Sequence, residues 1–178
     1  PEEYLAHNPF GTIPCLMHGE FYLYETGAIT RYIDETFPGP ALQPSVSSRR
    51  ARMNQIISIL DAYTYRPMVW DVYVQRIVVP SGGGQPDESL VAAALPNLQN
   101  VLQQLELLQD EYEFLTGDSV SLADLHAYPM LRYFMETPEG STMLTSYPGL
   151  EHWMQQMQAR PSARATSFHS TTETENGF

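Results

Sequence analysis

Apolar positions in the N-terminal part of the chain change their spacing twice. Residues 13–18 and 21–24 are short apolar-aromatic runs separated by a Gly-Glu pair, which predicts a β-hairpin. Apolar residues then recur at the spacing of a helix, which predicts an amphipathic helix over 27–37. Prolines and a glycine between 38 and 44 end this helix and predict a linker.

After the linker, the apolar positions follow helical spacing through most of the chain. The first stripe begins near Ser47 and continues past Pro67, where we expect a kink because proline cannot donate to the preceding turn. A glycine-rich loop over 81–86 follows this stripe. Further stripes predict helices over 91–112, 122–135 and about 150–157.

This pattern divides the chain into a small α/β unit and an all-helical unit. We expect the α/β unit over 1–38, a linker over 39–46 and an all-α domain over 47–165. Residues 166–178 are rich in Ser and Thr and contain no aliphatic residue, which predicts a disordered tail.

The charge balance narrows the range of partners. The 178 residues include 21 Asp and Glu against nine basic residues, all of them arginine, so the formal net charge is −12. Nucleic acids and anionic membranes need a basic surface that neutralises phosphates, so we expect neither as a partner. No apolar run reaches the roughly 20 residues of a membrane-spanning helix.

The histidines and the cysteine show no pattern that indicates chemistry. The five histidines lack the spacing of metal ligands and have no evident acidic partner, so we expect no metal site and ordinary surface or capping roles. The single cysteine, Cys15, excludes an intrachain disulfide, and we expect it to be a small core residue.

A first candidate motif covers residues 8–16, Asn-Pro-Phe-Gly-Thr-Ile-Pro-Cys-Leu. A cis bond before Pro14 would turn the N–H and C=O of Ile13 outward, where an extended peptide could pair with them as an added strand. A trans proline that begins a strand explains the same residues without a ligand.

A second candidate is the pair Glu25 and Thr26, where a strand end meets a helix start. Thr26 would offer a hydroxyl and free backbone N–H groups at the positive end of the helix dipole, which suits a carboxylate. Glu25 could accept hydrogen bonds from an ammonium group, so the pair could recognise both charges of a free amino-acid end. An ordinary helix cap beside a solvated acid is the alternative.

A third motif, Ser121 to Leu125, has a structural role. Ser121 stands at the expected N-cap of a helix and Asp124 three positions later, which predicts a capping box.

Taken in this order, the three motifs resemble those of the cytosolic glutathione S-transferases. The segment from Ser121 to Phe134, with Pro129 inside it, is most similar to the phi-type branch, and the similarity extends over residues 1–165. The resemblance implies a thioredoxin-like N-terminal domain, incomplete in this sequence, followed by an all-α C-terminal domain. It also implies a cytoplasmic detoxification enzyme that is a homodimer at full length.

The resemblance also implies roles for individual residues. The backbone of Ile13, before Pro14, would pair with the cysteinyl part of glutathione. Glu25 and Thr26 would hold the γ-glutamyl ammonium and carboxylate groups. Thr12 stands where phi-type members often carry a glutamine, so one contact to the tripeptide would be shorter or lost. Glutathione would be a co-substrate, with no permanently bound cofactor and no metal.

In the family, the helix that follows the linker lines the site of the second substrate. The aromatic-rich segment of this chain would place four residues there, although a core stripe explains the same spacing equally well. The four residues are Tyr65, Val69, Tyr73 and Arg76.

The family begins with a strand–helix–strand unit that supplies the Ser, Cys or Tyr activating the thiol, whereas this sequence starts at what resembles the second helix. We therefore expect the catalytic residue to lie upstream of Pro1 and the fragment alone to be inactive. The expected reaction is conjugation of glutathione to a small hydrophobic electrophile, or reduction with glutathione. The alternative is a non-catalytic binding or protein-interaction module with the same fold.

Overall fold

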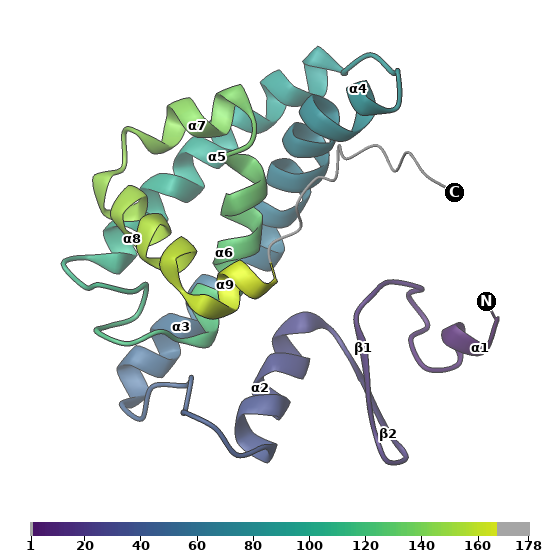
Figure 1. Ribbon diagram of the computed structural model, residues 1–178, viewed down its shortest axis with the longest axis vertical. Helices are drawn as coiled ribbons and strands as arrows, with labels where there is room; N and C mark the ends of the chain where they lie inside the picture. The colour runs from purple at the N-terminus through teal and green to yellow at the C-terminus, as the bar shows by residue number, and fades with distance from the viewer. Residues whose placement is uncertain (1, 167–178) are drawn as a thin grey trace, which may run out of the picture.

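A computed structural model describes residues 2–166 of the chain. Figure 1 shows a bundle of helices and, beside it, a smaller unit that contains the N-terminal elements. The predicted fold class, a short α/β region followed by an all-helical domain, is confirmed. Apart from Thr166, the predicted tail lies outside the described residues. The smaller unit consists of α1 (Glu2–Leu5), β1 (Cys15–His18), β2 (Phe21–Tyr24) and α2 (Thr26–Thr36).

The predicted hairpin is present. Strands β1 and β2 pair antiparallel, with Cys15 opposite Tyr24 and His18 opposite Phe21. The two-residue turn between them begins at Gly19, whose φ of +62° lies in the left-handed region. Glycine suits this position because it has no Cβ to clash with the backbone.

The helical domain begins with one long helical segment that continues past Pro67. It consists of α3 (Ser47–Ile59), the π-helical segments η1 (Leu60–Thr64) and η2 (Arg66–Val78), and α4 (Val79–Ser81). Pro67 cannot donate a hydrogen bond to the carbonyl of Tyr63 one turn earlier. The side-chain Nδ2 of Asn97 donates to this carbonyl instead, at 2.6 Å. The expected irregularity at Pro67 therefore takes the form of wider helical turns.

Five more helices complete the domain: α5 (Glu88–Gln109), α6 (Leu122–Phe134), α7 (Pro138–Leu144), α8 (Pro148–Ala159) and α9 (Pro161–Ala165). The sequence pattern did not predict α7. Its start nevertheless carries a recognisable signal, with Thr137 at the N-cap and Pro138 at the first helical position. The Thr137 hydroxyl accepts a hydrogen bond from the N–H of Gly140 at 3.0 Å.

The apolar core lies inside the helical domain. It is formed by the inward faces of α3, η1, η2, α5, α6 and α8, and its largest fully buried side chains include Trp153, Phe134 and Met53. Burial of such apolar surface is the main favourable term in folding.

One carboxylate, that of Asp124, lies within this core. It accepts hydrogen bonds from the backbone N–H of Leu115 (2.9 Å), from the N–H and the hydroxyl of Ser121 (both 2.7 Å) and from Nε1 of Trp153 (2.8 Å). The contact with Ser121 has the geometry of the capping box that the sequence predicts. Burial raises the pKa of Asp124, and the four hydrogen bonds oppose that rise.

The linker ties the smaller unit to the helical domain. The backbone N–H of Leu42 donates to the Asp34 carboxylate in α2 at 2.8 Å, and its carbonyl accepts from the N–H of Leu122 at 3.0 Å. Arg31 in α2 also donates to Oδ1 of Asn54 in α3, at 2.8 Å from Nη2. These contacts hold the middle and the C-terminal end of α2 against the helical domain.

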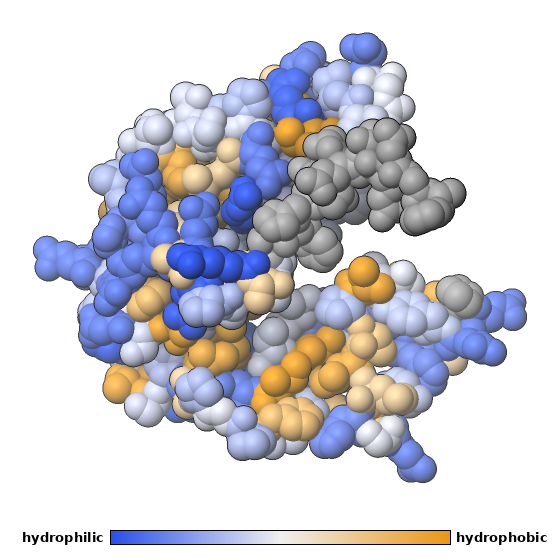
Figure 2. All heavy atoms as spheres, viewed as in Figure 1, coloured by the Kyte–Doolittle hydropathy of each residue, from blue (hydrophilic) through white to orange (hydrophobic). Residues whose placement is uncertain are grey.

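The surface of the smaller unit is partly apolar, as the orange area over α2 and the hairpin in Figure 2 shows. Its exposed large apolar side chains include Leu5, Phe10, Ile13, Met17, Phe21, Ile33 and Phe37. None of the helices in the described part of the chain is long and apolar enough to span a membrane.

Candidate functional site

A cavity of about 820 Å³ lies between the smaller unit and the helical domain. Figure 2 shows the hollow between these two parts of the molecule. The smaller unit contributes the loop before β1 and the first turn of α2, and the helical domain contributes η1, η2 and α6. The lining includes Thr12, Ile13, Glu25, Thr26, Arg31, Asp61, Tyr65, Val69, His126, Met130 and Tyr133.

The loop before β1 presents Ile13 to this cavity. Asn8, which is fully buried, shapes the loop because its side chain accepts from the N–H of Phe10 and donates to the carbonyl of Thr12. The bond between Ile13 and Pro14 is cis, one of the two alternatives left open by the sequence. Ile13 is 87% exposed, and its N–H and C=O have no hydrogen-bond partner among residues 2–166. Its backbone is therefore open to a ligand.

The turn from β2 into α2 presents Glu25 and Thr26 to the same cavity. Glu25 is the N-cap of α2, and its φ of 72° and ψ of 117° are unusual for a residue other than glycine. Its carbonyl accepts from the N–H groups of Ala28 and Ile29. The N–H groups of Thr26 and Gly27 remain without a partner in the described part of the chain. The start of α2 thus offers free donors beside a carboxylate and a hydroxyl.

The structure separates the four residues predicted for the second substrate. Tyr65 and Val69 line the cavity on the side of the helical domain. Tyr73 lies behind Tyr133, with ring centroids 4.7 Å apart, and burial raises the pKa of Tyr73, with a further contribution from Glu136. Tyr73 can influence the cavity through Tyr133, which lines it.

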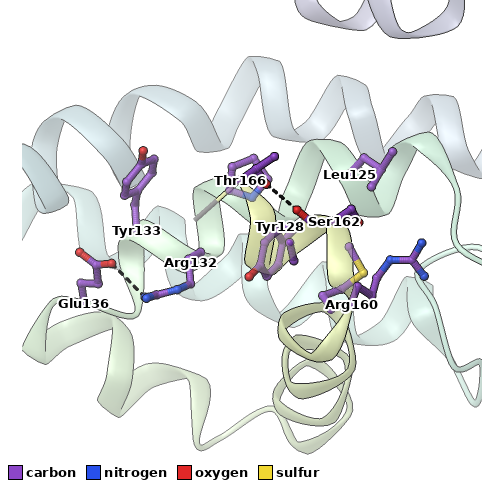
Figure 3. Close-up of a pocket in the computed structure, with 11 residues that line it drawn as sticks. Leu125, Tyr128, Arg132, Tyr133, Glu136, Arg160, Ser162 and Thr166 are labelled. Atoms are coloured by element: carbon purple, nitrogen blue, oxygen red, sulfur yellow. Dashed lines mark hydrogen bonds and ion pairs between the residues drawn. The ribbon is translucent and has the colours of Figure 1, made fainter. Parts of the chain in front are cut away.

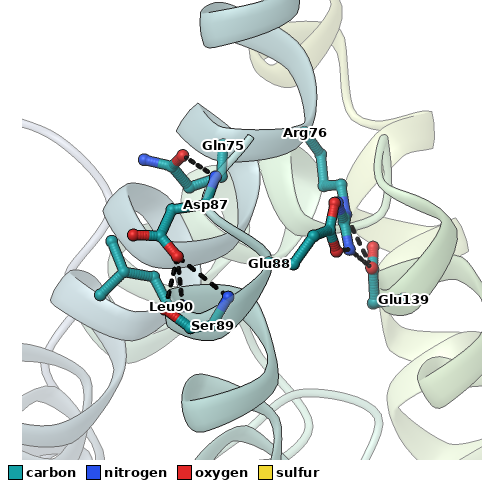
Figure 4. Close-up of polar contacts among 7 residues, drawn as sticks. All are labelled: Gln75, Arg76, Asp87, Glu88, Ser89, Leu90 and Glu139. Carbon is teal, nitrogen blue, oxygen red and sulfur yellow. Dashed lines mark hydrogen bonds and ion pairs between the residues drawn. The ribbon is translucent and has the colours of Figure 1, made fainter. Parts of the chain in front are cut away.

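Arg76 lies outside the cavity lining and links three helices instead. Its guanidinium forms ion pairs with Glu88 at the start of α5 (2.6 Å) and with Glu139 in α7 (2.6 Å), as Figure 4 shows. Hydrogen bonds to these two carboxylates raise the pKa of Arg76 and keep it charged. Its predicted role in binding the second substrate stays a prediction, and the contacts observed are structural.

The sequence reasoning missed a pair of cavity residues, Asp61 and His126. We expected no acidic partner for any histidine, and for His126 that expectation is wrong. Its Nε2 lies 2.7 Å from Oδ1 of Asp61, and its side chain is only 4% exposed. Asp61 stands four residues before Tyr65 and therefore on the same helical face, a spacing that could have placed it in the cavity.

A second pocket of about 350 Å³ lies between α6, α8 and α9. Figure 3 shows its lining, with the ion pair between Arg132 and Glu136 on one side. It shares Leu125, Pro129 and Tyr133 with the larger cavity, so α6 separates two hollows. Among the described residues, no group of three or more His, Cys, Asp or Glu is placed to hold a metal ion.

Comparison with known families agrees with this geometry. The profile described as glutathione S-transferase, C-terminal domain, matches residues 53–161. The profile described as glutathione S-transferase, N-terminal domain, matches residues 1–41. The chain belongs to the glutathione S-transferase family. The cavity described above therefore lies between the matched parts of its two family domains.

Plant glutathione S-transferases are among the most similar relatives. Probable glutathione S-transferase GSTF1 of Oryza sativa subsp. japonica is 32% identical, over 91% of this chain and 75% of the rice protein. Glutathione S-transferase F13 of Arabidopsis thaliana is 32% identical, over 89% of this chain and 73% of its own length. The predicted similarity to the phi-type branch is confirmed.

Solved structures of the family share the fold. Glutathione transferase F7 from Populus trichocarpa matches with a TM-score of 0.79 at 30% identity, covering 93% of this chain and 78% of the poplar chain. Glutathione S-transferase I, solved with the ligand lactoylglutathione, matches with a TM-score of 0.80 at 28% identity, covering 93% and 78% of the two chains.

Proposed function

We propose that this chain binds glutathione in the cavity between its two units. The observation that carries the proposal is that the open backbone of Ile13 and the start of α2 face one cavity. The cysteinyl part of glutathione would pair with Ile13, before Pro14 and beside Thr12. The γ-glutamyl carboxylate would lie on the N–H groups and hydroxyl of Thr26, and the ammonium group beside Glu25.

The reaction proposed is the one that the family carries out. The glutathione thiolate attacks an electrophilic carbon of a small hydrophobic substrate that lies against Tyr65 and Val69, and the C–S bond forms as a leaving group such as halide departs. In the reductive alternative, a second glutathione thiol forms the disulfide with the first as the substrate is released in reduced form. Apolar lining from Met130 and Tyr133 supports this choice, because an apolar electrophile loses unfavourable contact with water there. We propose a homodimer as the assembly, with exposed apolar side chains of the smaller unit as support.

Calorimetric titration of the 178-residue chain with glutathione tests the binding step. Glu25→Gln removes a charge with little change of shape, and we expect about tenfold weaker binding. Glu20→Gln, in the hairpin turn, is the matched control and should leave the affinity unchanged. Equal affinities for all three proteins would contradict the proposed site.

A turnover assay with glutathione and an aryl halide tests for transferase activity. Conjugate formation above the uncatalysed rate, lost together with binding in Glu25→Gln, supports the transferase and contradicts the expected inactivity of the 178 residues alone. Glutathione binding without conjugation of any electrophile in a panel agrees with that expected inactivity and equally with a non-catalytic module with this fold. Light scattering on the protein as it elutes from a size-exclusion column measures its molar mass and shows whether the chain is a dimer.

A further inference from the structure

A third pocket, of about 220 Å³, lies between the linker and the loop that precedes α6. Its lining comes from residues 41–46, from residues 116–121 and from Arg49 in the first turn of α3. Among the described residues, it shares no lining residue with either of the two hollows above. A ligand in this pocket would therefore be separate from glutathione.

Arg49 is the positively charged side chain in this lining. Within residues 2–166, no acceptor lies within hydrogen-bond distance of its guanidinium, and its ion pair with Oδ2 of Asp118 is 4.0 Å long. Asp118 is 75% exposed, so water screens this pair. The ring of Tyr112 holds the guanidinium from another side, with 5.0 Å between Cζ and the ring centroid. The N–H groups of Arg49 are therefore open to an anion with several oxygen atoms.

Gly117 leaves the space that this guanidinium occupies. A Cβ atom built on Gly117 would lie 2.9 Å from Nη1 of Arg49 and 3.5 Å from its Cζ. Because a larger residue would displace Arg49, the glycine keeps the guanidinium against the backbone of the loop that lines the pocket.

Thr116, next to this glycine, contributes a hydroxyl group without a partner. The residue is 4% exposed, and its Oγ1 makes no hydrogen bond to any of the residues described. A buried hydroxyl without a hydrogen bond destabilises the folded state, so such groups are rare and a ligand is one reason to keep them. Since Thr116 lines the pocket, an anion bound there could accept this hydrogen bond.

The start of α3 adds further donors. Val46, the N-cap residue, offers no side-chain acceptor, and the N–H groups of the next three residues have no partner in the described part of the chain. They lie at the positive end of the dipole of a 13-residue helix, beside the pocket that Val46 lines. Arg50 and Arg52 follow Arg49, so three of the nine basic residues of this acidic chain fall within four positions.

We propose that this pocket binds a phosphate group, either inorganic phosphate or the phosphate of a small phosphomonoester. The guanidinium of Arg49 donates to two of its oxygens, and Thr116 and the free N–H groups of α3 donate to the others. The exposed carboxylate of Asp118 turns into solvent as the anion replaces it at Arg49. The bound group connects the linker, α3 and the loop before α6, and so braces the connection between the two units. This inference does not rest on the proposed function.

Thermal unfolding of the 178-residue chain over a series of phosphate concentrations tests the proposal, with sodium chloride of equal ionic strength as the reference. At tenfold the dissociation constant, phosphate should raise the Tm by about 3–6 °C. Arg49→Gln should abolish this rise. Arg52→Gln, on the same helix but outside the lining, is the matched control and should keep it. No rise in the unaltered chain, or an equal rise in Arg49→Gln, would overturn the proposal.

Thr116 gives a sharper test because its two expected effects have opposite signs. Thr116→Val replaces the unpaired hydroxyl by a methyl group of similar size, so it should raise the Tm in the absence of phosphate. The same variant should bind phosphate about tenfold more weakly, because one donor to the anion is lost. Thr116→Ser keeps the hydroxyl and should bind phosphate like the unaltered chain. An unchanged phosphate affinity in Thr116→Val would remove Thr116 from the site.

Asp118→Asn distinguishes a specific site from general attraction between ions. Removal of the competing carboxylate should strengthen phosphate binding about threefold. Screening of the net charge of −12 would instead give the same response to phosphate in every variant, and this result would contradict the proposal. If Thr116→Val fails to fold, Arg49→Gln and Asp118→Asn, at side chains on the surface, still decide.

The same measurement with glycerol 3-phosphate distinguishes the two sources of the phosphate group. Tighter binding than that of inorganic phosphate would assign the pocket to a phosphomonoester, and weaker binding would assign it to the free anion. In both cases the Tm shift should be lost in Arg49→Gln, and a shift that persists in this variant would contradict the site.

Discussion

The two regions of the molecule use their apolar residues differently. In β1, β2 and α2, Ile29 is the buried large apolar residue, whereas Met17, Phe21 and Ile33 are exposed, as is Phe37 directly after α2. In the helical domain, the apolar faces of α3, α5, α6 and α8 are buried against one another. The helical domain therefore supplies most of the stabilising burial, and the residues proposed for glutathione lie mainly on the less buried region. The comparison indicates a stable scaffold that positions an open binding surface.

Removal of the buried carboxylate should destabilise the scaffold most. We expect Asp124→Ala to lower the free energy of unfolding by about 3–5 kcal/mol, because four donors would lose their acceptor in the core. Urea unfolding followed by tryptophan fluorescence measures this loss. Asp118→Ala, at a side chain that is 75% exposed, is the control, with an expected change below about 0.5 kcal/mol. Equal losses of unfolding free energy in the two variants would contradict the view that the buried core of the helical domain supplies most of the stability.

Hydrogen exchange should show the same division without any substitution. We expect the amides between Leu98 and Leu105 in α5 to exchange at least about 100-fold more slowly than those of β1 and β2. The hairpin has two strands and little buried apolar surface, so it can open without unfolding the helical domain. Mass spectrometry of peptides from both regions measures the difference. Matching protection would show that the hairpin opens only when the whole chain unfolds.

Two glycines offer a matched test with a smaller effect. A Cβ at Gly140 would lie 1.9 Å from the carbonyl oxygen of Phe134, so Gly140→Ala must displace the backbone of α7, at a cost of about 2–3 kcal/mol. A Cβ at Gly19 would meet nothing within 4 Å, and only its φ of +62° opposes alanine, so Gly19→Ala should cost about 1 kcal/mol. Thermal unfolding measures the stability lost in each variant. A larger loss in Gly19→Ala than in Gly140→Ala would contradict the conclusion that the helical domain supplies most of the stabilising burial.

The ion pairs of Arg76 should have the smallest effect and a defined pH dependence. The hydrogen bond from Arg76 lowers the pKa of Glu88. Stabilisation by this pair is therefore present above the ordinary glutamate pKa of about 4.3 and is lost as the pH falls through the lowered value. We expect Arg76→Gln to lower the Tm at neutral pH mainly through loss of the pair with Glu139, whose side chain is 17% exposed, because Glu88 is exposed and solvent screens its pair with Arg76.

Calorimetric scans over a pH series measure this dependence. The difference in Tm between Arg76→Gln and the unaltered chain should narrow as the pH falls from the ordinary glutamate pKa of about 4.3 through the lowered pKa of Glu88. Arg66→Gln, in an exposed pair with Asp71, is the control for loss of a surface charge. A difference in Tm that widens on acidification would show that the ion pair between Arg76 and Glu88 does not cause the pH dependence.

Local pattern alone determined most of the elements and the family. Alternation and helical spacing predicted the hairpin and α2, and Ser121 with Asp124 predicted the start of α6, because these features depend on residues near one another in sequence. The three ordered motifs also predicted the family and, through the resemblance to it, the residues proposed for the cysteinyl and γ-glutamyl parts of glutathione.

Only the tertiary structure showed that Asp61 lies beside His126 and that Arg76 lies outside the lining of the cavity. Asp61 and His126 are 65 positions apart, and Arg76 and Glu139 are 63 apart, so no local spacing connects them. Their contacts depend on how η1, η2, α6 and α7 pack around the shared core. The sequence indicates which groups can hold an amino-acid end, whereas the packing of helices decides which of them face the same cavity.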